Sequence, residues 1–446
     1  MKQKRIAIIV DNPKRDLPSC ALLALKLADN GFSVFLLPMN KMNQSLFALH
    51  PDYVLLNYVR HNNDKLVRQL LNFGVRIGVL DTEGGVFTKL EDTGKLNFFN
   101  VLTTDQFVRK NVTDYFVWGQ DLYQALLEER SFSKEQLRLT GTPRIDFYHS
   151  DFSNYFDFNL QTNEKVILLN SSFPIINPKF STPEVEIKTL IEKFNYKPDF
   201  IEKLVSHLMQ AQKKMIDLTK VLASEFPTRQ IVFRPHPFES WKIYEKTFGS
   251  LKNVRVTNEK TVDEWLHRSA VLVHYECSTA IEASLFGVPA LSFADMTSIR
   301  PIPYADMVTS FLSSNSEFVS TIKAILENRY QRPQGLEEKI ELVQRNLYGF
   351  DDGKAFDRIA SQIEKSVEHH SELNLKFALF YRLYYRTVRF AKLILRRSVF
   401  PPEKKFTQGD VQEIITKLSA STFQSQAFRA IDIGRDVVEI QAGSRK

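Results

Sequence analysis

The stretch Gln230-Ile-Val-Phe-Arg-Pro-His-Pro-Phe-Glu239 shows most clearly how this chain folds, because a short apolar run passes directly into charged residues and two prolines. Such a run is typical of a buried strand, and the prolines end the strand and stiffen the loop after it. The strand thereby delivers Arg234 and His236 to its carboxyl end. Rigidly held arginine and histidine side chains suit a phosphate that gains charge as it leaves. A capped strand end with a surface histidine is the alternative, and the Arg-Pro-His-Pro context favours the phosphate site.

Short apolar runs alternate with helical patterns on both sides of this stretch. Before it, strands are predicted at Arg5–Val10, Ser33–Leu37, Tyr53–Asn57, Arg76–Leu80, Tyr115–Trp118 and Leu137–Thr140, and a helix at Ser19–Asn30 with Ser19 as N-cap. After a polar linker the pattern restarts at Val166–Asn170 and continues to a strand at Ala290–Phe293. This alternation predicts an α/β protein with doubly wound parallel sheets. We expect Rossmann-like domains at 1–150 and 165–350, a closing helix at 351–370 and a basic helical tail at 371–446.

Composition narrows the class of protein. The 446 residues exceed the usual ~100–200 residues of one domain. With 43% hydrophobic and 25% charged residues, a packed globular core is expected. The two cysteines, Cys20 and Cys277, make neither a disulfide framework nor a zinc cluster. No signal peptide and no run of eighteen apolar residues is visible, so we expect a cytoplasmic protein.

The net charge of +7 is concentrated in one segment. Residues 374–400 carry seven lysines and arginines and no acid, so the rest of the chain is neutral overall. This is not the distributed patch of a nucleic-acid-binding protein, and no nucleic acid is expected as a partner. As a helix, the segment aligns Phe377, Phe380, Tyr381, Tyr384, Val388, Ala391 and Leu395 on one stripe. Such a helix suits an anionic inner-membrane surface, and a helix packed on the protein body is the alternative.

A second motif reads His274-Tyr-Glu-Cys-Ser-Thr-Ala-Ile-Glu-Ala-Ser-Leu-Phe-Gly-Val-Pro289. A strand again runs into a turn and a helix, and Ser278 and Thr279 fall where the helix begins. Free backbone N–H groups and hydroxyls there can bind an anion. Glu282, one turn further, can accept hydrogen bonds from ribose hydroxyls. An ordinary capped helix is the alternative, and the first motif in the same half of the chain favours a ligand site.

Together these two motifs resemble those of bacterial surface-carbohydrate biosynthesis glycosyltransferases of the GT-B fold. They are also similar to motifs of the capsule and O-antigen β-Kdo transferases and, more distantly, of the CDP-glycerol glycerophosphotransferases. Three further elements carry the resemblance: Leu139-Thr-Gly-Thr-Pro-Arg-Ile-Asp146, Asp81-Thr-Glu-Gly-Gly85 and Asp352-Gly-Lys-Ala355. The matches extend over residues 1–365.

The resemblance implies a nucleotide-sugar donor, such as CMP-Kdo, in the C-terminal domain. Arg234, His236, Ser278 and Thr279 would then hold its phosphate and Glu282 its ribose. The acceptor, a glycan or lipid-linked glycan of lipopolysaccharide O-antigen or capsule, would meet the N-terminal domain. The resemblance also implies catalysis without a metal or other cofactor. The sequence agrees in showing no DxD pair at a strand end and no His/Cys ligand spacing.

Asp81 and Glu83 are the candidate catalytic acids, because they follow a predicted strand. A carboxylate facing the anomeric carbon could act as general base, or as a nucleophile that forms a covalent intermediate. In the β-Kdo transferases an acidic residue before glycine is the nucleophile, and Glu83 matches that position with Glu in place of Asp. A solvated loop acid is the alternative.

Further candidates follow other predicted strands. They are Lys14 and Arg15 after the first strand, Asn170, Ser171 and Ser172 after the first strand of the second half, and Arg144 in the Thr-Gly-Thr-Pro-Arg element. No G-x-G-x-x-G fingerprint is present, and for Lys14, Arg15 and Asn170–Ser172 a structural turn is the alternative.

Four functions stay open at this point. A glycosyltransferase attached to the inner face of the plasma membrane is the first. The others are a polyol-phosphate transferase using a CDP-activated donor, a non-catalytic binding protein of GT-B fold, and a hydrolysing sugar epimerase of the same fold.

Overall fold

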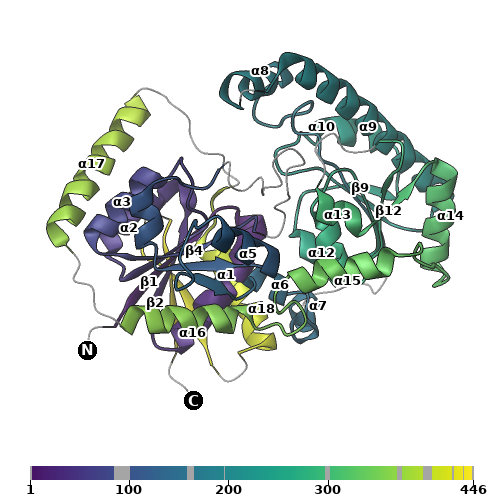
Figure 1. Ribbon diagram of the computed structural model, residues 1–446. Coiled ribbons are helices and arrows are strands. Elements are labelled where there is room, and N and C mark those ends of the chain that lie inside the picture. The colour runs from purple at the N-terminus through teal and green to yellow at the C-terminus, as the bar shows by residue number, and fades with distance from the viewer. Residues whose placement is uncertain are drawn as a thin grey trace. The chain divides into compact units, whose positions relative to one another are not determined.

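The computed structural model describes residues 3–84, 101–157, 165–194, 196–296, 302–368, 374–394, 404–423, 426–434 and 436–443. The chain divides into two compact units, Met1–Asn159 with Arg345–Lys446, and Leu160–Gln344 (Figure 1). Both ends of the chain therefore build the first unit, and the second unit is an insertion into it. This division differs from the predicted one, in which a closing helix and a separate tail follow residue 350.

The first unit is built on an eight-stranded sheet with the order β13-β14-β2-β1-β3-β4-β5-β6. Its parallel strands are β1 (Arg5–Val10), β2 (Ser33–Pro38), β3 (Tyr53–Leu56), β4 (Arg76–Leu80), β5 (Asp114–Val117) and β6 (Leu137–Leu139). The order from β2 to β5 is that of a flavodoxin-like sheet, in which the strand order reverses between β1 and β3. The carboxyl ends of β1 and β3 therefore mark the expected ligand edge of this unit.

Helices cover this sheet and bury apolar stripes against it. They are α1 (Pro13–Asp29), α2 (Met42–Leu49), α3 (Asp64–Phe73), α4 (Gln106–Asn111), α5 (Gln120–Glu128), α6 (Pro143–Asp146) and α7 (Ser153–Asp157), with short 3-10 turns at Met39–Lys41 and Ser150–Phe152. Helix α1 begins six residues before the predicted start, because Pro13 presets the first turn and Asn12 accepts the Lys14 N–H as N-cap. Ser19 lies inside the helix and donates to the Asp16 carbonyl at 2.9 Å.

Helix α16 (Ala355–Glu368) fastens the returning chain to the first unit. The buried Asp146 carboxylate accepts the N–H groups of Ala355 and Phe356 at 2.9 and 2.8 Å. The buried Asp114 accepts from the Gln362 amide at 2.9 Å and the Ser366 hydroxyl at 2.7 Å. These bonds explain why the closing helix predicted at 351–370 belongs to the first unit.

The predicted basic helical tail is helical only in part. Helix α17 (Leu375–Ile394) is followed by α18 (Gln408–Ser421) and by an antiparallel hairpin of β13 (Phe428–Asp432) and β14 (Val438–Ala442). Strand β14 pairs antiparallel with β2 and so extends the first sheet. The hairpin joins this sheet because apolar side chains alternate along both of its strands and are buried on one face. They are Phe428, Ala430, Val438 and Ile440.

The second unit contains a six-stranded sheet with the order β12-β11-β10-β7-β8-β9. Its strands, all parallel, are β7 (Val166–Asn170), β8 (Ile231–Arg234), β9 (Val254–Val256), β10 (Ser269–His274), β11 (Ala290–Phe293) and β12 (Thr309–Leu312). This is the 3-2-1-4-5-6 order of Rossmann sheets, whose ligand crevice lies where the order reverses, here between β7 and β10. The predicted fold class of two Rossmann-like domains is confirmed.

The helices of the second unit are α8 (Pro183–Phe194), α9 (Pro198–Glu225), α10 (Lys242–Phe248), α11 (Val262–His267), α12 (Thr279–Leu285), α13 (Pro303–Met307), α14 (Asn315–Leu326) and α15 (Leu336–Asn346). The long helix α9 forms because apolar residues recur at helical spacing and are buried, at Leu204, Leu208, Ala211, Met215, Leu218 and Leu222. Helix α15 runs across the boundary at which the chain returns to the first unit.

Candidate functional site

Three polar side chains lie in a row at the carboxyl edge of the second sheet. Asn170 ends β7 and pairs in register with Arg234 at the end of β8 and with His274 at the end of β10. Residues in register on neighbouring strands, which lie about 4.8 Å apart, project from the same face of a sheet. The row therefore stands where the strand order reverses, which is where doubly wound sheets bind their ligands.

Each member of this row has a buried polar atom that finds no hydrogen-bond partner in the described part of the chain. These atoms are Nε of Arg234, Oδ1 of Asn170 and Nδ1 of His274. The remaining bonds are few: His274 Nε2 meets the Thr309 hydroxyl at 2.9 Å, and Arg234 Nη2 donates to the Lys260 carbonyl at 3.3 Å. One unpaired buried polar group costs about 1–3 kcal/mol, so these three atoms offer hydrogen-bonding positions to a ligand or to ordered water.

The two sequence motifs come together at this edge. Arg234 lies within electrostatic range of Cys277 and Glu282, in the segment that follows β10. Glu276 in that segment has a φ of 44°, a left-handed conformation that is costly for a residue other than glycine and is often found at functional sites. The structure thus places the arginine of the first motif within electrostatic range of the second motif.

Ser278, Thr279 and Glu282 lie at the start of α12. Ser278 makes no capping hydrogen bond with its side chain, and the Thr279 hydroxyl accepts from the Cys277 thiol at 3.1 Å. Glu282 is buried in the first turn. Their positions agree with the predicted start of a helix, and their roles toward phosphate and ribose stay predictions.

His236 is an uncharged hydrogen-bond donor at neutral pH. Its Nδ1 accepts the Phe238 N–H at 3.3 Å, so the neutral ring carries its proton on Nε2. Burial and the charge of Arg234 lower the pKa of His236 to about 4. The ring can therefore donate through Nε2 to an oxygen atom of a ligand.

Glu239 joins the loops that follow β7 and β8. Its Oε2 accepts from the Ser171 hydroxyl at 2.7 Å, the Phe173 N–H at 3.2 Å and the His236 N–H at 3.3 Å, and Oε1 accepts from the Tyr244 hydroxyl. Burial raises the pKa of Glu239, and these four donors oppose the rise. Glu239 thus holds Ser171 and the backbone of His236 in place. Glu239 is the last residue of the first motif, and sequence analysis did not predict its role. The sequence indicates only that an acidic residue follows two prolines and a phenylalanine.

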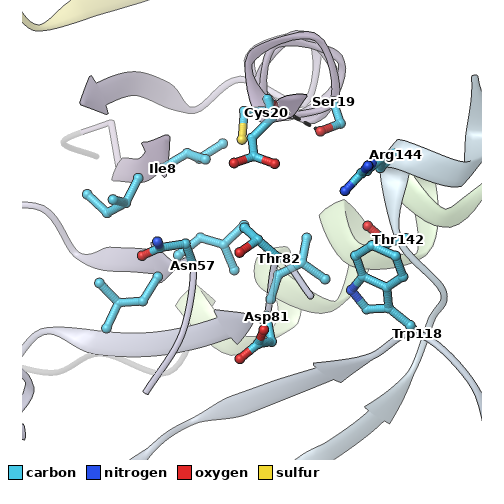
Figure 2. A pocket seen from close by; sticks show the side chains of 14 residues that line it. Ile8, Ser19, Cys20, Asn57, Asp81, Thr82, Trp118, Thr142 and Arg144 are labelled. Atoms are coloured by element: carbon cyan, nitrogen blue, oxygen red, sulfur yellow. Dashed lines mark hydrogen bonds between the residues drawn. The ribbon is translucent and has the colours of Figure 1, made fainter. Parts of the chain in front are cut away.

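A pocket of about 40 Å³ opens at the carboxyl ends of β1, β3 and β4 in the first unit (Figure 2). Arg144, on α6, points into it from one side. Asn57 Oδ1 and Trp118 Nε1, which belong to two buried lining residues, have no hydrogen-bond partner among the residues that the structure describes. An acceptor, a donor and a guanidinium around one small pocket can bind a single hydroxyl group. Arg144 was predicted from the sequence as a candidate site residue, whereas Asn57 and Trp118 were not.

Asp81 and Glu83 take different positions after β4. Asp81 is 1% exposed and accepts from Arg60 Nη2 at 3.0 and 3.2 Å and from the Glu83 N–H at 3.0 Å. Burial raises the pKa of Asp81 to about 6, although Arg60 and the Glu83 N–H lower it. The Glu83 side chain is 49% exposed and meets the same Arg60 nitrogen at 3.2 Å. Asp81 therefore positions the loop, and Glu83 is the carboxylate that a substrate can reach.

Lys14 and Arg15 lie in the first turn of α1. Arg15 pairs with Asp16 at 2.6 Å and with Asp11 at 3.4 Å, so its charge is matched within the turn. In the second unit, Ser172 is half-buried and follows Ser171 in the loop after β7. The first segment is helical and the second is irregular, and both follow the carboxyl ends of strands.

The described residues contain neither a metal-binding cluster nor a membrane-spanning helix. No group of three or more His, Cys, Asp and Glu side chains there is arranged to hold a metal ion. No helix in the same residues combines the length and the apolar character needed to cross a bilayer.

The two doubly wound domains give the chain the GT-B fold, as expected. A putative UDP-N-acetylglucosamine 2-epimerase from Listeria monocytogenes aligns with a TM-score of 0.52 and 14% identity, over 84% of this chain and 99% of that chain. The UDP-GlcNAc 2-epimerase from Neisseria meningitidis, bound to UDP-GlcNAc, gives 0.51 and 15%, over 81% and 100%. A variant of the wall teichoic acid polymerase TagF, soaked with CDPG, gives 0.52 and 14%, over 82% and 89%. No protein-family model and no curated protein matches the sequence.

Proposed function

We propose that this protein transfers a glycosyl group from a nucleotide-activated donor to a surface-glycan acceptor. The observation that carries the proposal is the row of Arg234, Asn170 and His274, whose buried polar atoms lack partners at the ligand edge of the second sheet. Structures of similar fold were solved with UDP-GlcNAc and with CDPG, which supports an activated nucleotide as the ligand.

In this proposal the donor phosphate lies against Arg234 and His236. Arg234 supplies a permanent cation, and His236 donates through Nε2. Ser278 and Thr279 add hydroxyl and N–H donors, and Glu282 accepts from the ribose. As the nucleotide leaves, its phosphate gains negative charge, and donors that are already in place stabilise that charge without reorganising. No metal takes part.

The acceptor hydroxyl is proposed to meet the first unit. The unpartnered Asn57 and Trp118 atoms and the guanidinium of Arg144 can bind a single hydroxyl group of the acceptor, which is proposed to be a glycan or a lipid-linked glycan. Glu83 is the proposed base or nucleophile, because it is exposed where Asp81 is buried and engaged. A CMP-Kdo-like donor, an O-antigen or capsule acceptor and action at the inner face of the plasma membrane follow from the sequence resemblance alone.

Two other reactions fit the same fold. The likeness to TagF favours transfer of a polyol phosphate from a CDP-activated donor, and the likeness to the 2-epimerases favours sugar epimerisation. All three reactions place an activated nucleotide at the edge of the second sheet, so nucleotide binding cannot distinguish them. The chemical identity of the product can. Mass spectrometry of products formed from UDP-GlcNAc, CMP-Kdo and CDP-glycerol separates a glycosylated acceptor, a phosphoglycerol adduct and an epimerised sugar.

The nucleotide site itself is tested by thermal shift with CMP, UDP, GDP, CDP and dTDP. We expect one nucleotide to raise the melting temperature, because a ligand at one hundred times its Kd stabilises the folded state by about 2.7 kcal/mol. The Arg234→Ala variant should lose the shift. The matched control is Arg255→Ala, since Arg255 is an exposed arginine of the same unit that pairs with Glu259. Absence of any shift, or an equal shift in the Arg234 variant, would reject the site.

A further inference from the structure

Helix α17 has one face that is fixed to the first unit. The rings of Tyr381 and Tyr385 pack against Phe47 of α2, with centroids 5.2 and 5.9 Å away. The Tyr385 hydroxyl also donates to the Gln69 side chain of α3. Figure 1 shows α17 lying against these two helices. The inner face of α17 is therefore defined by Tyr381 and Tyr385.

The opposite face of α17 is apolar and open. Leu379, Phe380 and Leu383 are 60%, 62% and 55% exposed. Leu379 and Leu383 each lie two positions along the chain from an inner tyrosine. On an α-helix, side chains two positions apart point in nearly opposite directions. This arrangement differs from the predicted stripe, which placed Tyr381 and Phe380 on one membrane-facing side. The side chains of Ala391 and Leu395 lie outside the described residues.

Positive charge accompanies the open apolar face. Lys376, Arg382 and Arg386 are exposed on the same helix, and residues 374–394 contain no acid. Lys65 of α3 adds a cation at the edge of the helix, where its ammonium donates to the Tyr384 hydroxyl at 3.2 Å. A surface that combines leucine and phenylalanine with several cations complements an anionic interface that also accepts apolar side chains. An anionic lipid bilayer has both properties.

We infer that the outer face of α17, made of Leu379, Phe380 and Leu383 with Lys376, Arg382 and Arg386, docks on an anionic lipid bilayer. The inner tyrosines hold the first unit to the helix, so docking of the helix brings that whole unit to the lipid surface. This inference rests on exposure and charge and does not depend on the proposed reaction.

The test is flotation of the full chain with vesicles of phosphatidylcholine alone and of phosphatidylcholine with phosphatidylglycerol. We expect binding to the anionic vesicles only, and weaker binding as salt concentration rises, because screening weakens the attraction. The double variant Leu379→Asp/Leu383→Asp should lower the bound fraction by about tenfold or more, since it places two anions in the apolar face. Both side chains are exposed, so the melting temperature should stay unchanged.

The matched control is Met209→Asp on α9, because Met209 is an equally exposed apolar residue, at 59%, in the second unit. It should bind vesicles as the wild type does. Equal binding of the double variant, equal binding to neutral vesicles or no binding of the wild type would overturn the inference. So would a wild-type dimer that the double variant dissociates, because the face would then be a protein interface. The nucleotide thermal shift of the double variant reports separately on the proposed function.

Discussion

Just after β8, burial and the fixed charge of Arg234 together keep His236 neutral. Burial and Arg234 together lower the pKa of His236 to about 4. A phosphate bound between the two side chains would reverse this balance, because a nearby anion favours the charged imidazolium. The empty and the occupied site should therefore differ in the charge of one ring.

We predict that binding of the stabilising nucleotide raises the pKa of His236 from about 4 to above 6. Binding then takes up protons between pH 4 and 6, because the bound state holds a proton that the free state has released. The measurement is an NMR titration of the His236 ring proton with and without nucleotide, with the resonance assigned by its loss in His236→Gln. An unchanged pKa at saturating nucleotide would place the phosphate elsewhere.

Among the elements, α6 and α16 show what two of the sequence motifs do in the folded protein. Asp146, from the Thr-Gly-Thr-Pro-Arg-Ile-Asp element, caps α16 by accepting the Ala355 and Phe356 N–H groups. Arg358 of α16 donates in return to the Thr140 carbonyl at 2.8 Å. The two motifs therefore hold each other, and in this structure they join the returning segment, residues 345–446, to the first unit.

Replacing Asp146 tests that junction. We expect Asp146→Ala to lower the free energy of unfolding by about 1–2 kcal/mol, because it removes an N-cap acceptor. Burial raises the pKa of Asp146 from its ordinary value of 3.8 to about 7 in the folded state. The folded state then binds more protons than the unfolded state over that range, so the stability from this group falls as pH rises from about 4 to 7.

Urea unfolding at pH 4.5 and 7.5 measures this effect in the wild type and in Asp146→Asn, which cannot titrate. The wild type should lose stability relative to the variant between the two pH values. The control is Asp151→Asn, since the Asp151 side chain is 70% exposed. A wild type that instead gained stability relative to Asp146→Asn would contradict a raised pKa.

At the scale of the whole molecule, the chain leaves the first unit, builds the second and returns. The returning segment adds α16, α18 and the β13–β14 hairpin, and these elements bury Val411, Ile415, Leu418 and Ile440 in the first unit. The second unit has a core of its own from residues 167–322. The two units should therefore respond differently to loss of the chain end.

We predict that deleting residues 404–446 destabilises the first unit and leaves the second one folded. The deletion removes the partner of β2 and exposes the apolar side chains that α18 covers. Hydrogen exchange followed by mass spectrometry should show lost protection in β1 and β2 and retained protection in β7, β8 and β10. Unchanged protection in β1 and β2 would mean that the returning segment is an appendage. Because truncation of the chain end is expected to unfold the first unit, point substitutions on α17 are the better test of membrane docking.

The sequence determined the local features of this protein by itself, because strand runs, helix periods and the residues after a strand depend on neighbours along the chain. The carboxyl-end positions of Arg234, His236, Asn170 and Asp81 followed from that pattern, and so did the two doubly wound sheets. Only the tertiary structure decided that residues 345–446 return to the first unit. It also decided that Arg60 holds Asp81, that Glu239 joins two loops, and that α17 packs Tyr381 and Tyr385 against α2 and exposes Leu379 and Leu383. These contacts join residues tens to hundreds of positions apart or depend on which helix face finds a partner, and local patterning carries no information about either.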